Sequence, residues 1–135
     1  MRTICKHLSI VEATGGDRLD VYRGIINPID YDFGLEKGGE YLVFGMSLRH
    51  GTTWLYVTQS PWSSPPDIRL VPAALFEFSA REIPPAMVLT VSANGCDAEI
   101  VPAAVASFEH WYERYVEDDA GVVRAVAAAV LRLSG

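Results

Sequence analysis

Residues 40–58 read EYLVFGMSLRHGTTWLYVT, two runs of aromatic and aliphatic residues separated by a polar turn at His50-Gly51. Runs of this composition on either side of a short Gly-containing turn are typical of a β-hairpin. In the first run, both the odd-numbered and the even-numbered residues are largely apolar, and these two sets point to opposite faces of a strand. The sequence therefore predicts a central hairpin that is covered on both faces.

The residues after this hairpin carry further β signals. Residues 59–67 hold three prolines and three serines and are expected to form an exposed loop. Beyond it the pattern predicts a strand at 68–71, one turn of 3₁₀ helix at 72–75, and short strands at 76–78 and 87–91. Asn94-Gly95 predicts a turn that lets residues 99–101 pair back on the preceding strand.

The residues before the hairpin also alternate. Residues 3–12 predict a strand with Ile4 and Lys6 on one face and Cys5 and His7 on the other. Gly15-Gly16 marks a turn, and residues 19–26 predict a return strand with a bulge at Gly24. Residues 27–40 predict an ordered linker that its aromatic residues attach to the core.

The C-terminal third has helical periodicity. Pro102 suits the first position of a helix, in which Val105, Phe108, Trp111 and Tyr115 recur on one side. Asp118-Asp119 is placed to cap a second, very apolar helix ending at Leu133, which either packs on the sheet or forms an oligomer contact. We therefore predict an α+β fold in one domain, 1–135. Its residues 1–101 are mostly β, a bent antiparallel sheet or partial barrel of about six strands, and residues 102–135 form two helices.

Composition limits the classes of partner. Half of the 135 residues are hydrophobic, enough for one core, and 11 basic against 17 acidic residues give a net charge of −6. Nucleic acid is a poor partner because binding it requires clustered Lys and Arg. An acidic chain suits a basic protein surface better. No secretory leader or membrane span is recognisable, so we expect a cytoplasmic protein without membrane attachment.

Few residues suggest catalysis or metal binding. Cys5 and Cys96 are expected to be free thiols, with a single long-range disulfide as the alternative. Cys5-x-His7 could form a nucleophile–base pair or half of a metal site, but an edge strand with two partly buried polar groups is favoured. Solvated charges are likewise favoured over a cation site for the acidic loop that holds Asp30, Asp32, Glu36 and Glu40, because it lacks the ligand spacing of an EF-hand. We predict no catalytic residues, metal or cofactor.

An acidic row on the first C-terminal helix is the strongest local indication of a partner. Glu109, Glu113 and Glu117 are spaced at i, i+4 and i+8, where like charges repel. The row is either a solvated helix face on which Arg114 and His110 reduce the repulsion, or a surface on which a basic partner docks. Trp62 in the Pro/Ser-rich loop could be an exposed contact residue or could pack under its own prolines. The predicted partner-binding set is Glu109, Glu113, Glu117, Asp118, Asp119, Trp62, Asp30 and Asp32.

The hairpin and the segment Pro72-Ala73-Ala74-Leu75-Phe76-Glu77-Phe78 together resemble small bacterial domains in which an aromatic strand pair runs into a closing Pro-Ala-x-Leu-Phe-Glu segment. The resemblance covers residues 40–91 and implies an SH3-like partial barrel of the kind found among immunity proteins of bacterial toxin systems. The long loop at 60–67 departs from the compact hairpin of that pattern. The shared motif is structural, so the resemblance implies no active site.

These observations favour a non-enzymatic, acidic binding protein, and specifically an immunity protein that neutralises a cognate toxin by occlusion. Acidic groups would complement a basic toxin surface and speed association, and aromatic anchors would supply affinity. One rival hypothesis is a small-ligand binder or enzyme that uses the barrel mouth, with Cys5, His7 and His50 taking part. A second rival is a homodimeric structural adaptor that associates through residues 120–133.

Overall fold

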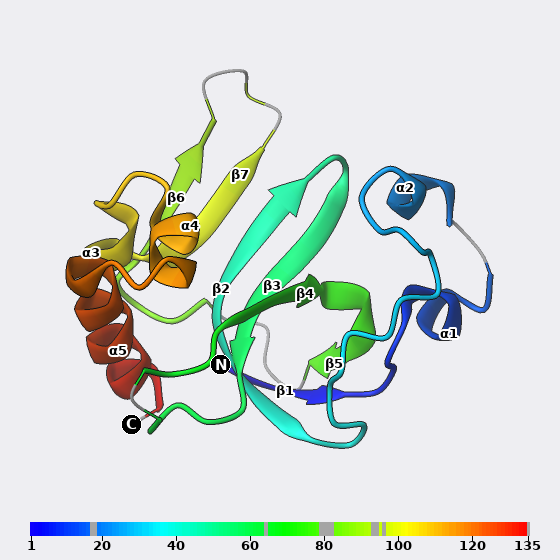
Figure 1. Ribbon diagram of the computed structural model, residues 1–135, viewed down its shortest axis with the longest axis horizontal. Helices are drawn as coiled ribbons and strands as arrows, with labels where there is room; N and C mark the ends of the chain where they lie inside the picture. The colour runs from blue at the N-terminus through cyan, green and yellow to red at the C-terminus, as the bar shows by residue number, and fades with distance from the viewer. Residues whose placement is uncertain (17–18, 64, 79–82, 93–94, 96, 135) are drawn as a thin grey trace.

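The computed structural model describes residues 1–16, 19–63, 65–78, 83–92, 95 and 97–134. Within these residues it is an α+β fold built on one open, antiparallel, seven-stranded sheet (Figure 1). The strands are β1 (Arg2–Cys5), β2 (Glu40–Arg49), β3 (Thr52–Thr58), β4 (Arg69–Pro72), β5 (Phe76–Phe78), β6 (Met87–Val91) and β7 (Ala98–Pro102). Their order is β4-β3-β2-β1-β5, with β7 also paired to β2 and β6 paired to β7. The predicted fold class is confirmed, and the sheet does not close into a barrel.

The β2–β3 hairpin is the centre of this sheet, as predicted. His50 and Gly51 connect the strands with φ angles of 50° and 76°. Two consecutive positive φ angles define the hairpin turn whose twist matches that of the strands. All residues of β3 except Thr53 are buried, and so are Tyr41 to Gly45 of β2. The hairpin is therefore covered on both faces.

Strand β2 is long enough to pair with two different strands along one side. Its first half pairs with β1, with Arg2 opposite Leu42, and its second half pairs with β7, with Met46 opposite Ile100. The register with β3 shifts between Val43 and Gly45, which marks a β-bulge. The two ends of β2 can therefore join separate parts of one sheet.

Each face of the sheet has its own hydrophobic cluster. One face buries Cys5, Ile10 and Leu75 against the odd-numbered residues Tyr41 and Val43 of β2. The other face is covered by α3 (Ala103–Ala106), α4 (Trp111–Val116) and α5 (Ala120–Ser134), which gather on one side of the molecule (Figure 1). Four residues of α5 are buried in this second cluster, Val122, Val126, Ala129 and Val130. The apolar C-terminal helix thus packs within its own chain.

Of the two strands predicted near the N-terminus, one is shorter than expected and the other is wrong. Residues 3–12 form a strand only as far as Cys5, after which α1 (Ile10–Thr14) begins. Its N-cap is Ser9, whose side chain accepts a hydrogen bond from the Glu12 amide at 3.2 Å. The region predicted as a return strand, 19–26, contains α2 (Asp20–Arg23), and its predicted bulge at Gly24 is the C-cap of that helix. At α1, the cap formed by Ser9 outweighed the short alternation of apolar residues.

The predicted continuous helix from Pro102 is also wrong, because it is broken into α3 and α4. His110, with a φ of 55°, lies just before α4 begins. Val105 and Trp111 are six residues apart and would be separated by about 120° around one helix. The break lets both side chains be buried against the sheet.

The remaining elements agree with the sequence. The strands β4, β5 and β6 and the 3₁₀ turn η1 (Ala73–Leu75) lie where the pattern predicts them, and β6 pairs with β7. Asn94 of the predicted turn and the predicted thiol of Cys96 lie outside the described residues. Among the helices of the described residues, none combines the length and hydrophobicity needed to cross a membrane.

Candidate functional site

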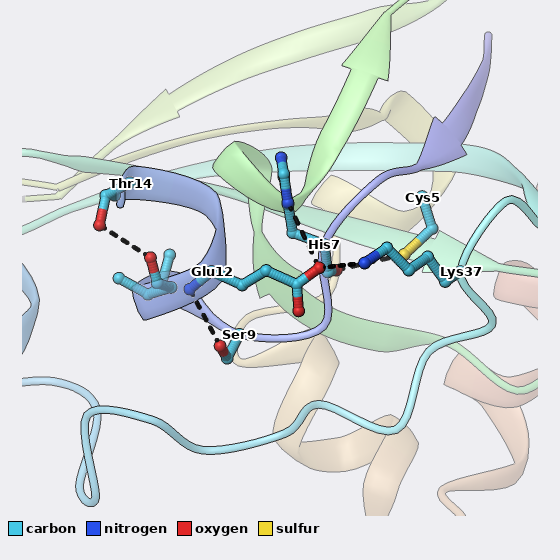
Figure 2. A network of polar contacts seen from close by, with 7 residues as sticks. Cys5, His7, Ser9, Glu12, Thr14 and Lys37 are labelled. Atoms are coloured by element: carbon cyan, nitrogen blue, oxygen red, sulfur yellow. Dashed lines mark hydrogen bonds and ion pairs between the residues drawn. The ribbon is translucent and has the colours of Figure 1, made fainter. Parts of the chain in front are cut away.

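The Cys5–His7 pair belongs to a polar network at the start of α1 (Figure 2). The fully buried Cys5 thiol donates to the backbone oxygen of His7 at 3.3 Å, not to its imidazole. Burial raises the pKa of this thiol. Since the thiolate is the reactive form, the geometry does not activate Cys5 as a nucleophile.

Glu12 is the centre of that network. Its carboxylate pairs with the Lys37 ammonium and lies 3.6 Å from Nδ1 of His7. The hydrogen bond from Lys37 lowers the pKa of Glu12. These contacts tie α1 to the loop before β2. The predicted strand face that would present Cys5 and His7 together does not exist, because β1 ends at Cys5.

Three of the four carboxylates of the predicted acidic loop contact other groups of the chain. Asp32 accepts a hydrogen bond from the Gly34 amide at 2.7 Å, Glu36 accepts one from Gln59, and Glu40 pairs with Arg2 at 3.4 Å. In the part of the chain that the structure describes, no group of three His, Cys, Asp or Glu residues is arranged to hold a metal ion.

A surface hollow of about 270 Å³ lies between the sheet and α4 and is the candidate site. The sheet contributes side chains from β2, β3, β6 and β7, and the helical region contributes side chains from α3 through α4. We call this the acidic hollow, and its lining residues are Arg49, Tyr56, Thr90, Glu99, Ala106, Phe108, Glu109, His110, Trp111, Tyr112 and Glu113.

The floor of the acidic hollow is a hydrogen-bonded cluster. The Tyr56 hydroxyl donates to one oxygen of Glu99, and Nε1 of Trp111 donates to the other at 3.1 Å. Arg49 donates to the Tyr56 hydroxyl at 3.2 Å and to Ser47 at 2.7 Å. Burial, followed by the Glu99 carboxylate, raises the pKa of Tyr56, so the phenol stays protonated and remains a donor. The floor is therefore a fixed arrangement.

Packed rings hold this floor in place. The centroid of the Tyr56 ring lies 4.8 Å from that of Trp111 and 5.1 Å from that of Tyr112. The centroids of the Trp111 and Phe44 rings are 5.5 Å apart. Tyr56 is completely buried and Trp111 is 3 % exposed. The break between α3 and α4 allows Trp111 to contact both Glu99 and Tyr56. The site therefore depends on this break.

The acidic hollow is electronegative. Its lining holds three carboxylates, Glu99, Glu109 and Glu113, and one guanidinium, Arg49, which gives a formal net charge of −2 with His110 neutral. Glu109 and Glu113 are exposed at its rim, and Nε2 of His110 lies 3.6 Å from one oxygen of Glu109. Both oxygens of Glu99, in contrast, accept hydrogen bonds from within the chain. The arrangement suits a cationic group that enters from solvent and pairs with the rim carboxylates.

The structure brings together only part of the predicted acidic row. Glu109 precedes α4, Glu113 lies within it, and Glu117 is its C-cap, so the three do not form one helical stripe. Glu117 and Asp118 are exposed and lie outside the lining of the acidic hollow. Asp119 has a structural role, because it pairs with Arg114 at 2.9 Å and its side chain accepts from the Val122 amide at 3.3 Å.

The other predicted contact residues lie on separate loops. Trp62 is 75 % exposed, so its ring does not pack under the neighbouring prolines. Asp30 and Asp32 are exposed in the loop before β2, beside the half-exposed Tyr31. None of these three lines the acidic hollow.

Sequence reasoning missed Arg49 and Glu99. The available signal was the charge of Glu99 within an otherwise apolar strand, since a carboxylate in such a position needs donors. The identity of the donors depends on the pairing of β2 with β7 and on the break before α4. Neither feature has a local sequence signature.

Comparisons with known proteins found no relative of this chain. No protein-family model matches the chain, and neither the curated proteins nor the solved structures yield a match.

Proposed function

We propose that this chain is a non-enzymatic binding protein whose acidic hollow receives a basic side chain of a protein partner. The observation that carries the proposal is the exposed pair Glu109 and Glu113 at the rim of a hollow with a fixed aromatic floor. Arginine is the best fit among basic side chains because its planar fork pairs with two carboxylate oxygens. The half-buried Tyr112 ring in the lining offers a flat surface beside that fork.

The more specific form of the proposal is an immunity protein that neutralises a bacterial toxin by covering a basic surface. The net charge of −6 favours rapid association with such a surface. The resemblance of residues 40–91 to immunity-type domains supports the same assignment. Occlusion needs only tight contact, and it does not require turnover by this chain.

The first test is identification of the partner by co-purification from the native strain. The wild-type chain and the double variant Glu109→Gln/Glu113→Gln serve as parallel baits, because the two differ by two charges at the rim. We expect a basic protein to be retained by the wild-type chain and lost from the variant. Elution of that protein by moderate salt is expected as well, since charge pairs at an exposed rim are screened.

A partner retained equally by both baits would refute the acidic hollow as the binding site. The exposed Trp62 and the loop of Asp30 and Asp32 would then be the next surfaces to change. Retention of an acidic protein, or of nucleic acid alone, would refute the proposed class of partner.

A further inference from the structure

The sheet has three edge strands among the described residues, and they differ in their chemistry. Edge strand β4 contains the exposed Arg69 and ends at Pro72, and edge strand β5 is three residues long with Glu77 at its centre. Charge, proline and short length are the features that prevent a strand edge from pairing with another chain. The third edge, β6 (Met87–Val91), reads MVLTV and has none of these features.

The hydrogen bonds of the β6–β7 pair show which backbone groups face outward. The Ser92 amide donates to Asp97 and the Ala103 amide donates to Ala86, each at 2.9 Å. Hydrogen-bonded and non-bonded pairs alternate along an antiparallel ladder, so the even-numbered residues of β6 bond to β7. The N–H and C=O groups of Met87, Leu89 and Val91 therefore point away from β7. Pro102, which has no N–H, lies opposite Met87 and agrees with this register.

Two of these three residues, Leu89 and Val91, form an exposed apolar row, whereas Met87 is half-buried. Leu89 is 62 % exposed and Val91 is 54 % exposed. Leu89 is opposite Ile100, which is opposite Met46, so the row continues across β7 onto β2. Thr90 and Glu99 alternate with these residues and line the acidic hollow, which places the apolar row on the opposite face of the sheet.

We propose that β6 pairs with β6 of a second copy of this chain. Antiparallel pairing about a two-fold axis at Leu89 places Leu89 opposite its own copy and Met87 opposite Val91. The three outward residues of each chain then form about six hydrogen bonds between the copies. A second copy fits this edge because the pairing is self-complementary and because β6 is uncharged in a chain of net charge −6. The acidic hollows remain open on the other face, so the inference is independent of the proposed function.

Sedimentation equilibrium of the purified chain tests this pairing between about 5 and 200 µM, where a micromolar Kd is measurable. We expect a mass that rises toward twice 14.8 kDa. Leu89→Lys is expected to weaken the dimer by at least about tenfold, because it places a charge at the centre of the shared edge. The matched control is Leu131→Lys on α5, since Leu131 is 60 % exposed and should leave the dimer intact.

A second variant distinguishes loss of the dimer from misfolding of the chain. Leu89→Pro removes only an N–H that faces outward, so the ladder with β7 is kept while the pairing of copies is lost. Circular dichroism melts verify that each variant is folded. A wild-type chain that stays monomeric up to about 200 µM would overturn the proposal, as would a dimer that Leu89→Pro leaves intact. Dissociation by Leu131→Lys alone would place the dimer contact on α5 and overturn it equally.

Discussion

Replacement of Gly45 by alanine should destabilise the fold, because this residue lies against β7 where β7 pairs with β2. A Cβ atom built on Gly45 would lie 2.7 Å from Cγ1 of Val101 and 2.8 Å from the backbone oxygen of Ile100. Both distances are shorter than the contacts that Cβ atoms make in folded proteins. The carbonyl cannot move unless β7 moves with it, so the clash is not relieved by a side-chain rotation.

The expected magnitude follows from two opposing effects. Inserting a methyl group into a well-packed position costs about 1–3 kcal/mol. Replacing glycine in a strand recovers roughly 0.5–1 kcal/mol of that cost, because alanine has less backbone freedom to lose. Because one clash is with a backbone oxygen, we expect the upper part of the insertion cost, about 2–3 kcal/mol. Gly45→Ala should then lower the free energy of unfolding by about 1–2.5 kcal/mol, with a melting temperature lower by roughly 3–10 °C.

Urea unfolding followed by tryptophan fluorescence measures the change. The matched control is Gly24→Ala, because a Cβ atom on Gly24 would have nothing within 4 Å and the φ of −83° at this residue suits alanine. This control should be neutral or stabilised by about 0.4–1 kcal/mol. A Gly45→Ala variant as stable as the wild type would contradict the close approach of β7 to β2 and, with it, the floor of the acidic hollow.

Three further predictions follow from other contacts. Tyr56→Phe removes one of the two donors to Glu99 and should lower the free energy of unfolding by about 1–3 kcal/mol in urea titrations, and an unchanged midpoint would contradict the described floor. Arg114 lowers the pKa of Asp119 below its ordinary value of 3.8, so Asp119 contributes stability above that pH and loses it as the pH falls through the lowered pKa. The difference in melting temperature between the wild type and Asp119→Ala should accordingly be largest near pH 7 and shrink below pH 3.8, and a difference independent of pH would count against the ion pair. In a Cys96→Ser background, the Cys5 thiol should react with Ellman's reagent only after unfolding, because it is fully buried and its pKa is raised; rapid reaction of the folded chain would disprove this.

The fold was predictable where one local signal had no competitor. The His50-Gly51 turn separates two strongly apolar runs, and Asp119 caps α5 as its position before an apolar helical stretch suggests. The prediction failed at residues 3–12, where alternation over a few residues competed with a capping signal at Ser9 and Glu12. That pair fits the Ser-x-x-Glu capping pattern, which could have identified the start of α1.

The candidate site was predictable only in part, because it depends on contacts between distant segments. Glu109 and Glu113 were expected to bind a partner and do share the acidic hollow, but not through the helical stripe that suggested them. Glu99 and Tyr56 are 43 positions apart, and their contact requires β7 to pair with the far half of β2. Sequence periodicity reports which face of an element is apolar, and it does not report which elements meet.

The measurement that bears most directly on the proposed function is calorimetric titration of the co-purified partner into two single variants. Glu113→Gln and Glu117→Gln remove the same charge from neighbouring turns, but only Glu113 lines the acidic hollow. We expect Glu113→Gln to weaken binding by about tenfold or more, as for the loss of one charge-assisted contact of about 1.5–3 kcal/mol, and Glu117→Gln to change it by less than about threefold. Equal affinities for the two variants would contradict the assignment of the acidic hollow as the binding site.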